Sequence, residues 1–357
     1  MTTTPAAAEF RRTALPHAGA VQFLGLSGWR IPAHFGDPEA EYRAASEGVA
    51  LFDAGFLTFV SATGKDQIDY LNRRLSQRIL DLEAGTVLRA NQLGGDGRML
   101  ADLEVLRPNP EGEGLLLIGP PATSGEGLAA LCERYVFSED CQFADAGGLW
   151  SALALLGPKA DGALRALGGP VPAPGEVLAW PAEDGGARFV LRSTFLPQGV
   201  LVVGSPGSVA SLYAAFGVSI PSLGWLAFDT VRIEQGIAWW GIDLTVKSIP
   251  LEADLNIAVH PNKGCYPGQE TIAKIVNLGH PARKLVGVIW DTEDPPAPGV
   301  EITSGGVAAG VLTSSTWSPR QSKAIGLAMV RWNYRAVGTG LEIGLIRGKV
   351  ATLPFSV

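Results

Sequence analysis

The chain has 357 residues, of which 46% are hydrophobic and 18% charged, so it can bury the cores of two or three domains and is no disordered segment. Its net charge of −7 argues against a protein that binds nucleic acid over its whole surface, although one local basic site stays open. The 45 glycines and 25 prolines predict many turns and short strands rather than long helices.

Cysteine and histidine usage indicates the cellular setting. Cys132, Cys141 and Cys265 make no short pair of the zinc or redox type, and the four histidines are scattered, so we expect no metal site. Three cysteines without such a pairing fit a reduced, cytoplasmic protein. The N-terminus lacks the apolar core of a secretory signal, and no apolar run approaches the length of a membrane span, so we expect no membrane association.

The elements of the first 280 residues follow from apolar periodicity. Residues 1–20 predict a flexible arm, and residues 21–280 predict the main body. Gly94-Gly95-Asp96-Gly97 separates two apolar runs and is a strong hairpin signal. The predicted strands are 56–61, 86–93, 98–107, 115–119 and a hairpin over 188–204; the predicted helices are 64–78, 124–137, 158–168, 207–217 and 223–235.

The pattern changes after Pro281. Short apolar runs follow in quick succession, separated by turns rich in Gly and Pro, which is typical of a small antiparallel barrel. We therefore expect a C-terminal β-barrel over residues 281–357, with a boundary near 280–284. Its predicted strands are 284–291, 306–315, 323–332 and 341–351.

The run K-G-C-Y-P-G-Q-E at residues 263–270 concentrates reactive groups in little apolar context. A helix is predicted to begin at its end, so Cys265 would precede the first helical turn. The helix N-terminus and the charge of Lys263 would both favour a reactive thiolate. The alternative is that Cys265 is a small buried hydrophobe, as free cysteine often is, and we interpret Cys132 and Cys141 in that way.

A local excess of positive charge follows the same run. Between His260 and Lys284 the chain carries Lys263, Lys274, Arg283 and Lys284 against Glu270, a local charge of +3. This stretch is either an ordinary solvated face or a landing site for an anion such as a carboxylate tail or a nucleic-acid phosphate.

The run at residues 263–270 resembles the signature of the YgfZ family, which are folate-binding proteins related to the glycine cleavage T-protein (aminomethyltransferase). Residues 27–53 resemble the T-protein opening, and residues 231–255 resemble its R-x-E-x-G…G-x-D…P-x-E-A segment. The resemblance covers roughly residues 21–352. It implies an α+β fold in which two interleaved α/β subdomains form a folate channel and the C-terminal antiparallel barrel closes it.

The resemblance also implies a function. The protein would be a tetrahydrofolate-binding accessory protein (tetrahydrofolate or a C1-substituted form) that supports assembly or repair of iron–sulfur enzymes, including tRNA-modifying ones. Iron–sulfur client proteins would be partners, and tRNA a further partner through the basic stretch. The signature cysteine falls on Cys265 as a reactive thiol, and its cofactor-binding positions fall on Lys263, Tyr266, Gln269 and Glu270.

Two departures from the T-protein pattern bear on catalysis. Only Asp102 remains of the paired aspartates that follow the Gly-rich hairpin, and residues 194–199 lack the acid that grips the pterin in T-proteins. Loss of such groups removes polar partners that orient an aminomethyl substrate. We therefore expect a protein that is not a working aminomethyltransferase. The alternative function is a folate-dependent aminomethyltransferase or demethylase, which Asp102 favours.

Three further residues are candidates for contact with folate. Asp102 lies in an apolar strand and either faces solvent or lines a cavity, and the resemblance favours the cavity. Arg232 and Glu234 would share a face if their stretch were a strand; they form an ion pair, or Arg232 meets the folate glutamate tail. Trp239 and Trp240 cannot both face one core by alternation, so Trp240 either packs in the core or offers its ring for stacking.

Overall fold

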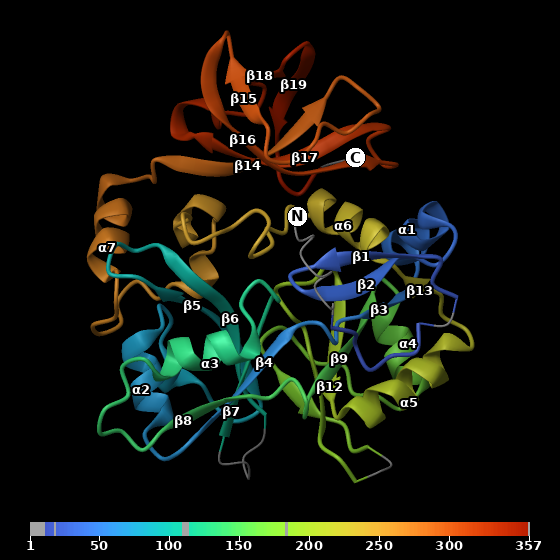
Figure 1. The fold of residues 1–357 in the computed structure, drawn as a ribbon, viewed down its shortest axis with the longest axis vertical. Coiled ribbons are helices and arrows are strands. Elements are labelled where there is room, and N and C mark those ends of the chain that lie inside the picture. The colour runs from blue at the N-terminus through green and yellow to red at the C-terminus, as the bar shows by residue number, and fades with distance from the viewer. Residues whose placement is uncertain (1–10, 18, 109–113, 183–184, 356–357) are drawn as a thin grey trace, which may run out of the picture.

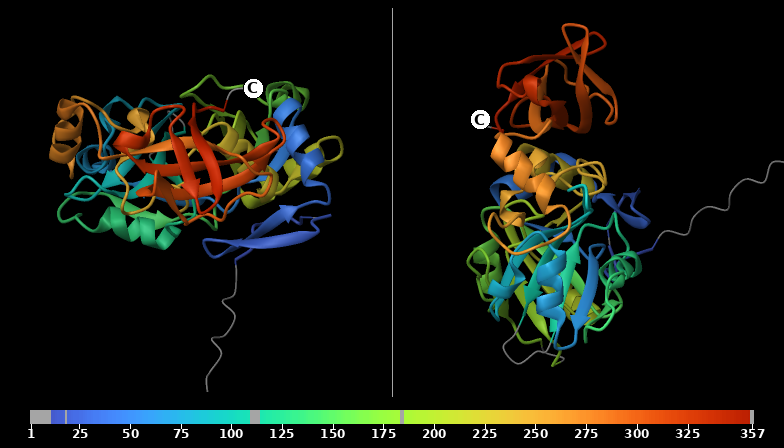
Figure 2. Two further views of the ribbon diagram at one scale, coloured as in Figure 1. Left: turned by 90° about the horizontal axis from the view of Figure 1, so that it is seen from above. Right: turned by 90° about the vertical axis from the view of Figure 1, so that its left-hand side faces the viewer.

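The computed structural model describes residues 11–17, 19–108, 114–182 and 185–355. Figure 1 shows two lobes side by side, with a barrel on top of them and helices in between. Seen at right angles in Figure 2, the barrel stands at one end of the molecule. The predicted α+β class with a C-terminal antiparallel barrel is confirmed.

The first lobe is built on the sheet of order β5-β6-β7-β4-β8. Its helices α2 and α3 are amphipathic or apolar on one side and pack against it, burying Tyr70, Leu71 and Leu128. The elements of this lobe are β4 (Thr58–Thr63), α2 (Gln67–Arg74), β5 (Thr86–Leu93), β6 (Met99–Arg107), β7 (Gly114–Gly119), α3 (Gly125–Glu133) and β8 (Gln142–Asp145), with a 3₁₀ turn at Ile79–Asp81.

The second lobe is interleaved with the first in the sequence. Its sheet, of order β10-β11-β12-β9-β3-β13, pairs β3 with β9, so all strands of the first lobe fall between these two neighbours. Its elements are α1 (Pro38–Glu47), β3 (Ala50–Asp53), β9 (Ser151–Leu156), α4 (Ala160–Ala166), β10 (Val177–Ala179), β11 (Arg188–Leu191), β12 (Gly199–Gly204), α5 (Pro206–Gly217), β13 (Ser222–Leu223) and α6 (Trp225–Glu234).

The barrel closes through the pairing of β14 with β19. Inward-facing residues such as Val288, Leu312 and Val330 are fully buried, as the period-2 pattern requires. Its strands are β14 (Arg283–Trp290), β15 (Glu301–Ser304), β16 (Val307–Ser318), β17 (Lys323–Arg331), β18 (Gly340–Ile343) and β19 (Ile346–Ala351), with a 3₁₀ turn at Trp332–Tyr334. Residues 341–351, predicted as one strand, are thus two strands around a tight turn.

Several elements were not predicted from the sequence. The hairpin of β1 (Gln22–Leu26) and β2 (Trp29–His34) and the helix α1 fall in a stretch for which no strand or helix is predicted. Short 3₁₀ turns at Pro250–Ala253 and Asn256–Ala258 join the second lobe to α7 (Gln269–Leu278). Residues 11–17 of the predicted arm pack onto the body, where Leu15 is buried; residues 1–10 lie outside the described part of the chain.

The predicted hairpin after β5 packs directly on the start of α7. Gly97 has a φ of +79°, and a Cβ there would lie 2.8 Å from the Cβ of Thr271 in α7. A Cβ on Gly268 would lie 2.5 Å from the carbonyl oxygen of Gly94. Glycine at both positions therefore allows two backbones to touch, which side chains would prevent.

We expect Gly97→Ala to lower the free energy of unfolding by about 1–3 kcal/mol, because alanine there combines positive φ with a clash. The matched control is Gly95→Ala in the same hairpin, where an added Cβ meets no atom within 4 Å among the described residues. Urea unfolding followed by tryptophan fluorescence measures both. Equal stability of the two variants would show that the hairpin does not dock as described.

Candidate functional site

A central cavity of about 1150 Å³ lies where the first lobe meets the N-terminal segment, the β1–β2 turn and the 240–246 turn. That is large enough for a folate-sized ligand. Its wall combines apolar and aromatic side chains, among them Trp29, Phe59 and Trp240, with the cationic Arg11 and Arg12 and the carboxylate of Asp145. The lining segments are 11–12, 27–29, 57–59, Leu100, 121–125, 145–148, 240–241 and 245–246.

Trp240 is the predicted stacking residue that the structure places in this wall. The residue is 4% exposed, and its indole Nε1 donates to the Thr123 hydroxyl at 3.4 Å. Trp239 instead points into the core of the second lobe, where its ring meets Trp225 and Phe228 edge to face. The two adjacent tryptophans therefore face different environments, as predicted from the sequence.

Asp102 lies behind this wall rather than in it. It is buried on β6 and forms a bidentate ion pair with Arg89, whose Nε donates to Oδ1 at 3.0 Å; Asn91 also donates to Oδ1. Trp240 and Thr123 line both the cavity and a small void that Asp102 borders. Burial alone would lower the pKa of Arg89, but the Asp102 carboxylate raises it, so Arg89 stays charged.

Residues 194–199 include no acidic side chain, but an acidic side chain of β6 contacts this segment. Glu104 accepts hydrogen bonds from the backbone and the hydroxyl of Thr194, at 2.5 and 2.8 Å. Burial raises the pKa of the Glu104 carboxyl, although these bonds oppose the shift. The Arg89 guanidinium lies 4.6 Å from the ring centre of Phe195 in the same segment. We call Arg89, Asn91, Asp102, Glu104 and Thr194 the interior charge cluster.

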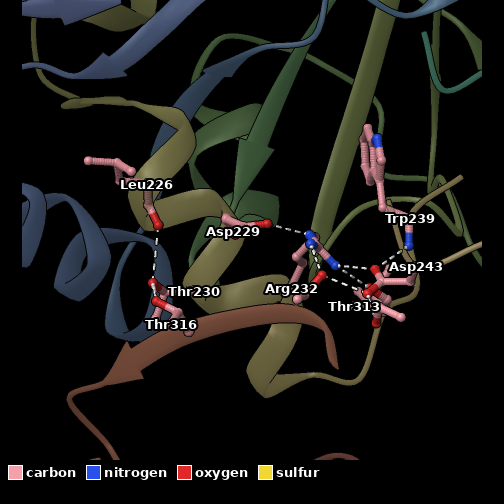
Figure 3. Close-up of polar contacts among 10 residues, drawn as sticks. Leu226, Asp229, Thr230, Arg232, Trp239, Asp243, Thr313 and Thr316 are labelled. Carbon is pink, nitrogen blue, oxygen red and sulfur yellow. Dashed lines mark hydrogen bonds and ion pairs between the residues drawn. The ribbon is translucent and has the colours of Figure 1, made fainter. Parts of the chain in front are cut away.

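Arg232 has no hydrogen bond or ion pair to this cluster among the contacts described, and lies in a buried network between α6 and the barrel (Figure 3). Its guanidinium donates to Asp229 at 2.6 Å, to Asp243 at 2.8 Å and to the Ser314 hydroxyl of β16 at 2.8 Å. The stretch is a helix and not a strand, so Arg232 and Glu234 do not share a face, and no ion pair joins them among the contacts described. Arg232 does not line the cavity, and its network gives it a structural role.

The ammonium group of Lys263 caps the C-terminal end of α2. Its ammonium donates to the backbone carbonyls of Asn72, Leu75 and Gln77, the last at 2.8 Å. Asn72 lies in the last turn of α2, and Leu75 and Gln77 follow its C-terminal end, where positive charge is favourable. Burial lowers the pKa of Lys263 to about 8. Its hydrogen bonds go to this helix end, so the charge that was predicted to activate Cys265 is engaged elsewhere.

The remaining residues of the 263–270 run divide into packed and exposed ones. Tyr266 is buried against the barrel-side core, and its backbone N–H donates to the Gln269 side chain at 3.2 Å. Cys265 and Glu270 are exposed. Cys265 is thus accessible, unlike Cys132 and Cys141, but neither it nor any other residue of the run lines the central cavity. The helix begins at Gln269, four residues beyond the thiol.

The basic stretch is neutralised by acids from an adjacent segment. Arg283 binds Glu252 through two hydrogen bonds of 2.8 Å, and Lys284 pairs with Asp254. Glu252 and Asp254 precede the segment from His260 to Lys284 that carries the local charge of +3. The local +3 is therefore a feature of the linear sequence rather than of the surface.

Sequence reasoning missed the cavity residues Arg11, Arg12, Trp29, Thr123 and Asp145, because they come from loops and chain segments distant in sequence. Arg89 and Glu104 could have been found, since the predicted hairpin fixes the register in which Arg89 opposes Glu104 and Asn91 opposes Asp102. Among the described residues, no three His, Cys, Asp or Glu side chains are grouped to hold a metal ion, and no helix could cross a membrane.

Comparison with known proteins identifies the family. Residues 13–174 match the GCVT N-terminal domain, and residues 283–356 match the glycine cleavage T-protein C-terminal barrel domain. The aminomethyltransferase of Rubrobacter xylanophilus is 30% identical over 90% of this chain and 87% of its own length. The chain belongs to the glycine cleavage T-protein family.

Further relatives agree with this membership. The aminomethyltransferase of Bacillus velezensis is 25% identical over 93% of each chain. The crystal structure of glycine cleavage system aminomethyltransferase T from Bartonella henselae superimposes with a TM-score of 0.87, covering 97% of this chain and 98% of that one at 23% identity. That similarity shows the T-protein fold, which confirms the fold implied by the resemblance.

The functional interpretation drawn from the YgfZ resemblance is corrected by these relatives. An accessory role for iron–sulfur enzymes was predicted, with iron–sulfur clients and tRNA as partners. Curated relatives that match about nine-tenths of this chain are named aminomethyltransferases, and none of these names points to iron–sulfur assembly or tRNA. The resemblance rested on the 263–270 run, in which Lys263 caps the end of α2 and Gly268 packs against the 94–97 hairpin.

Arg232→Met should lower the free energy of unfolding by about 3–5 kcal/mol, since it leaves two carboxylates without their buried counter-ion. The matched control is Arg43→Ala, which removes an exposed pair with Glu39 and should cost at most about 0.5 kcal/mol. Urea titration of both variants checks the difference. A cost below about 1 kcal/mol for Arg232→Met would contradict the assigned network.

In the native protein, one thiol should react rapidly with an aromatic disulfide reagent, and that thiol should be Cys265. Burial raises the pKa of Cys132 to about 12 and also raises that of Cys141, so both should react only after unfolding. Cys265→Ser provides the control and should leave no fast-reacting thiol. Fast labelling that persists in this variant would show that the lobes are looser than described.

Proposed function

We propose that this protein is a tetrahydrofolate-dependent C1 transferase that moves the methylene carbon of an aminomethyl donor to tetrahydrofolate and releases ammonia. The observation that carries the proposal is the central cavity with Trp240 in its wall, inside a fold whose curated relatives are aminomethyltransferases. A flat pteridine or benzoyl ring stacks favourably on an indole face. Trp240 borders the cavity together with a hydroxyl partner, Thr123, and a carboxylate partner, Asp145.

Two acids are available to this chemistry, in different environments. Asp145 is exposed at the cavity wall, where its Oδ1 accepts the backbone N–H of Gly147 at 2.9 Å. Asp102 is buried behind Trp240 and held by Arg89. A carboxylate that directly faces the ligand can exchange protons with it, whereas a buried, paired one acts through its charge. We assign Asp145 the first role and Asp102 the second.

Within the T-protein family, we infer that this chain belongs to the YgfZ branch. The intact 263–270 run supports the assignment, as does the alanine at position 101, where T-proteins carry the first of two aspartates. Ala101 is buried in the core of the first lobe. In the interior charge cluster, Asp102 is the retained aspartate, and Glu104 brings a carboxylate to Thr194, in the segment that lacks an acid of its own.

Trp240→Ala should weaken tetrahydrofolate binding by about 1–3 kcal/mol, the contribution of one stacked ring. The matched control is Trp317→Ala, which removes a half-exposed tryptophan on β16 that does not line the cavity. Calorimetric titration with tetrahydrofolate measures both. If the two variants lose the same affinity, or if the wild type shows no saturable binding, folate does not occupy this cavity.

Turnover tests the reaction itself. The wild type should convert aminomethyl donors and tetrahydrofolate to methylene-tetrahydrofolate and ammonia. Asp102→Asn should reduce the rate at least about 100-fold while folate binding remains, as expected for loss of a preorganised charge. Formation of methylene-tetrahydrofolate is followed spectrophotometrically. Absence of product with several aminomethyl donors, under conditions where folate binds, would refute the transferase.

A further inference from the structure

One face of the β5–β6 pair is polar although it is buried. Arg89 and Asn91 of β5 lie on this face, as do Asp102 and Glu104 of β6, because the residues of each pair are two apart on their strand. The intervening residues, such as Ala90, pack in the core of the first lobe. All four polar residues are at most 5% exposed. Charges buried this deeply require specific partners.

A turn of the second lobe, between β11 and β12, covers this face. The backbone N–H and the hydroxyl of Thr194 donate to Glu104 Oε1 at 2.5 and 2.8 Å, and the Thr194 carbonyl accepts from Arg89 Nη1 at 3.4 Å. The ring centre of Phe195, which is fully buried, lies 4.6 Å from the Arg89 guanidinium. Two consecutive residues of the second lobe therefore contact both an acid and the cation of this first-lobe face.

Two carboxylates compete for Arg89. The strand register places Glu104 directly opposite Arg89, and both Glu104 and Asp102 act on its charge. The guanidinium nevertheless binds Asp102, since Nε donates to Oδ1 at 3.0 Å and Nη2 donates to Oδ2. Glu104 instead has Oε1 on Thr194, and its Oε2 has no hydrogen-bond partner among the described atoms. The contact with Thr194 thus leaves Arg89 to Asp102.

The Asp102 carboxylate is fixed in orientation by this pairing. The planar fork of an arginine makes two parallel hydrogen bonds, and Asn91 adds a third at 2.8 Å to Oδ1. Asp102 borders a small void together with Trp240 and Thr123, and those two residues line the central cavity. Arg89 itself does not line the cavity, so its influence on a ligand there passes through Asp102.

We propose that Arg89 is a positioning residue for the C1 transfer, which couples the placement of the 194–195 turn of the second lobe to the orientation of the Asp102 carboxylate. The inference rests on the proposed function, in which Asp102 acts through its charge. Electrostatic catalysis depends on charges that are fixed before the reaction begins, and a small misplacement lowers the rate strongly. Arg89 holds the charge in place, and Phe195 and Thr194 hold Arg89.

A double-mutant cycle on kcat tests the proposal. Arg89→Lys keeps the positive charge and loses the planar fork, so it should lower kcat about tenfold while KM for tetrahydrofolate changes by less than about twofold. In an Asp102→Asn background the same substitution should lower kcat no further, because its effect passes through the Asp102 carboxylate. A purely structural role would lower kcat by the same factor in both backgrounds.

The matched control is Arg188→Lys, the same substitution at a buried arginine of β11. Its guanidinium donates to the carbonyls of Trp180 and Pro181, within the second lobe. Arg188→Lys should leave kcat within about twofold in both backgrounds, as expected for distant, independent sites. Thermal unfolding of every variant confirms that each one is folded under the assay conditions.

Phe195→Leu tests the link to the second lobe. It removes the ring beside the Arg89 guanidinium and leaves every polar group of the cluster in place. It should lower kcat about threefold, the contribution of one cation–π contact, and should have no further effect when combined with Arg89→Lys. Losses that multiply in this combination would show that the second lobe does not act through Arg89.

The outcomes separate the two proposals. If the wild type forms no methylene-tetrahydrofolate, the proposed function fails, and the role of Arg89 fails with it. If the wild type turns over but Arg89→Lys leaves kcat unchanged, or lowers it equally with and without the Asp102 carboxylate, the C1 transfer stands and the positioning role of Arg89 is wrong.

Discussion

The architecture depends on the buried charge network around Arg232. This single guanidinium joins three parts of the molecule: α6, the turn that carries Asp243, and strand β16 of the barrel. Asp243 also accepts the backbone N–H of Trp239 at 2.9 Å and the Thr313 hydroxyl at 2.6 Å. Glu234, at the end of the same helix, accepts from Tyr42 of α1 and from Ser318 of β16. Buried charges of this kind are costly unless fully paired, so they fix one relative placement of barrel and lobes.

That placement determines the site. Because the N–H of Trp239 is bound by Asp243, the following residue, Trp240, is directed into the cavity wall while Trp239 fills the core. The R-x-E and G-x-D elements of residues 231–255 are therefore framework residues that position an aromatic ring. The same holds for the 263–270 run, in which Lys263 closes the end of α2 and Gly268 allows contact with the 94–97 hairpin. A chemically reactive side chain can have a purely structural role when its hydrogen-bond donors are already bound by backbone carbonyls.

The sequence predicted local structure well because local signals determined it. The hairpin around Gly94–Gly97 and the helices α5 and α6 follow from turn chemistry and apolar period, and the barrel follows from rapid alternation. Family resemblance supplied the interleaved lobes, which no local pattern encodes. The function drawn from the signature was wrong, since a short motif was given more weight than the similarity of the whole chain to aminomethyltransferases. Arg232 could not be placed from sequence, because its partner Ser314 is 82 residues away. The cavity likewise collects residues from segments as distant as Arg11 and Val246.

The most direct test of this account is a crystal structure of the protein with tetrahydrofolate bound. The account predicts the pteridine or benzoyl ring against the face of Trp240, inside the cavity between residues 11–12 and the 121–125 loop. Folate found next to Cys265 on the outer surface, with the central cavity empty, would contradict it.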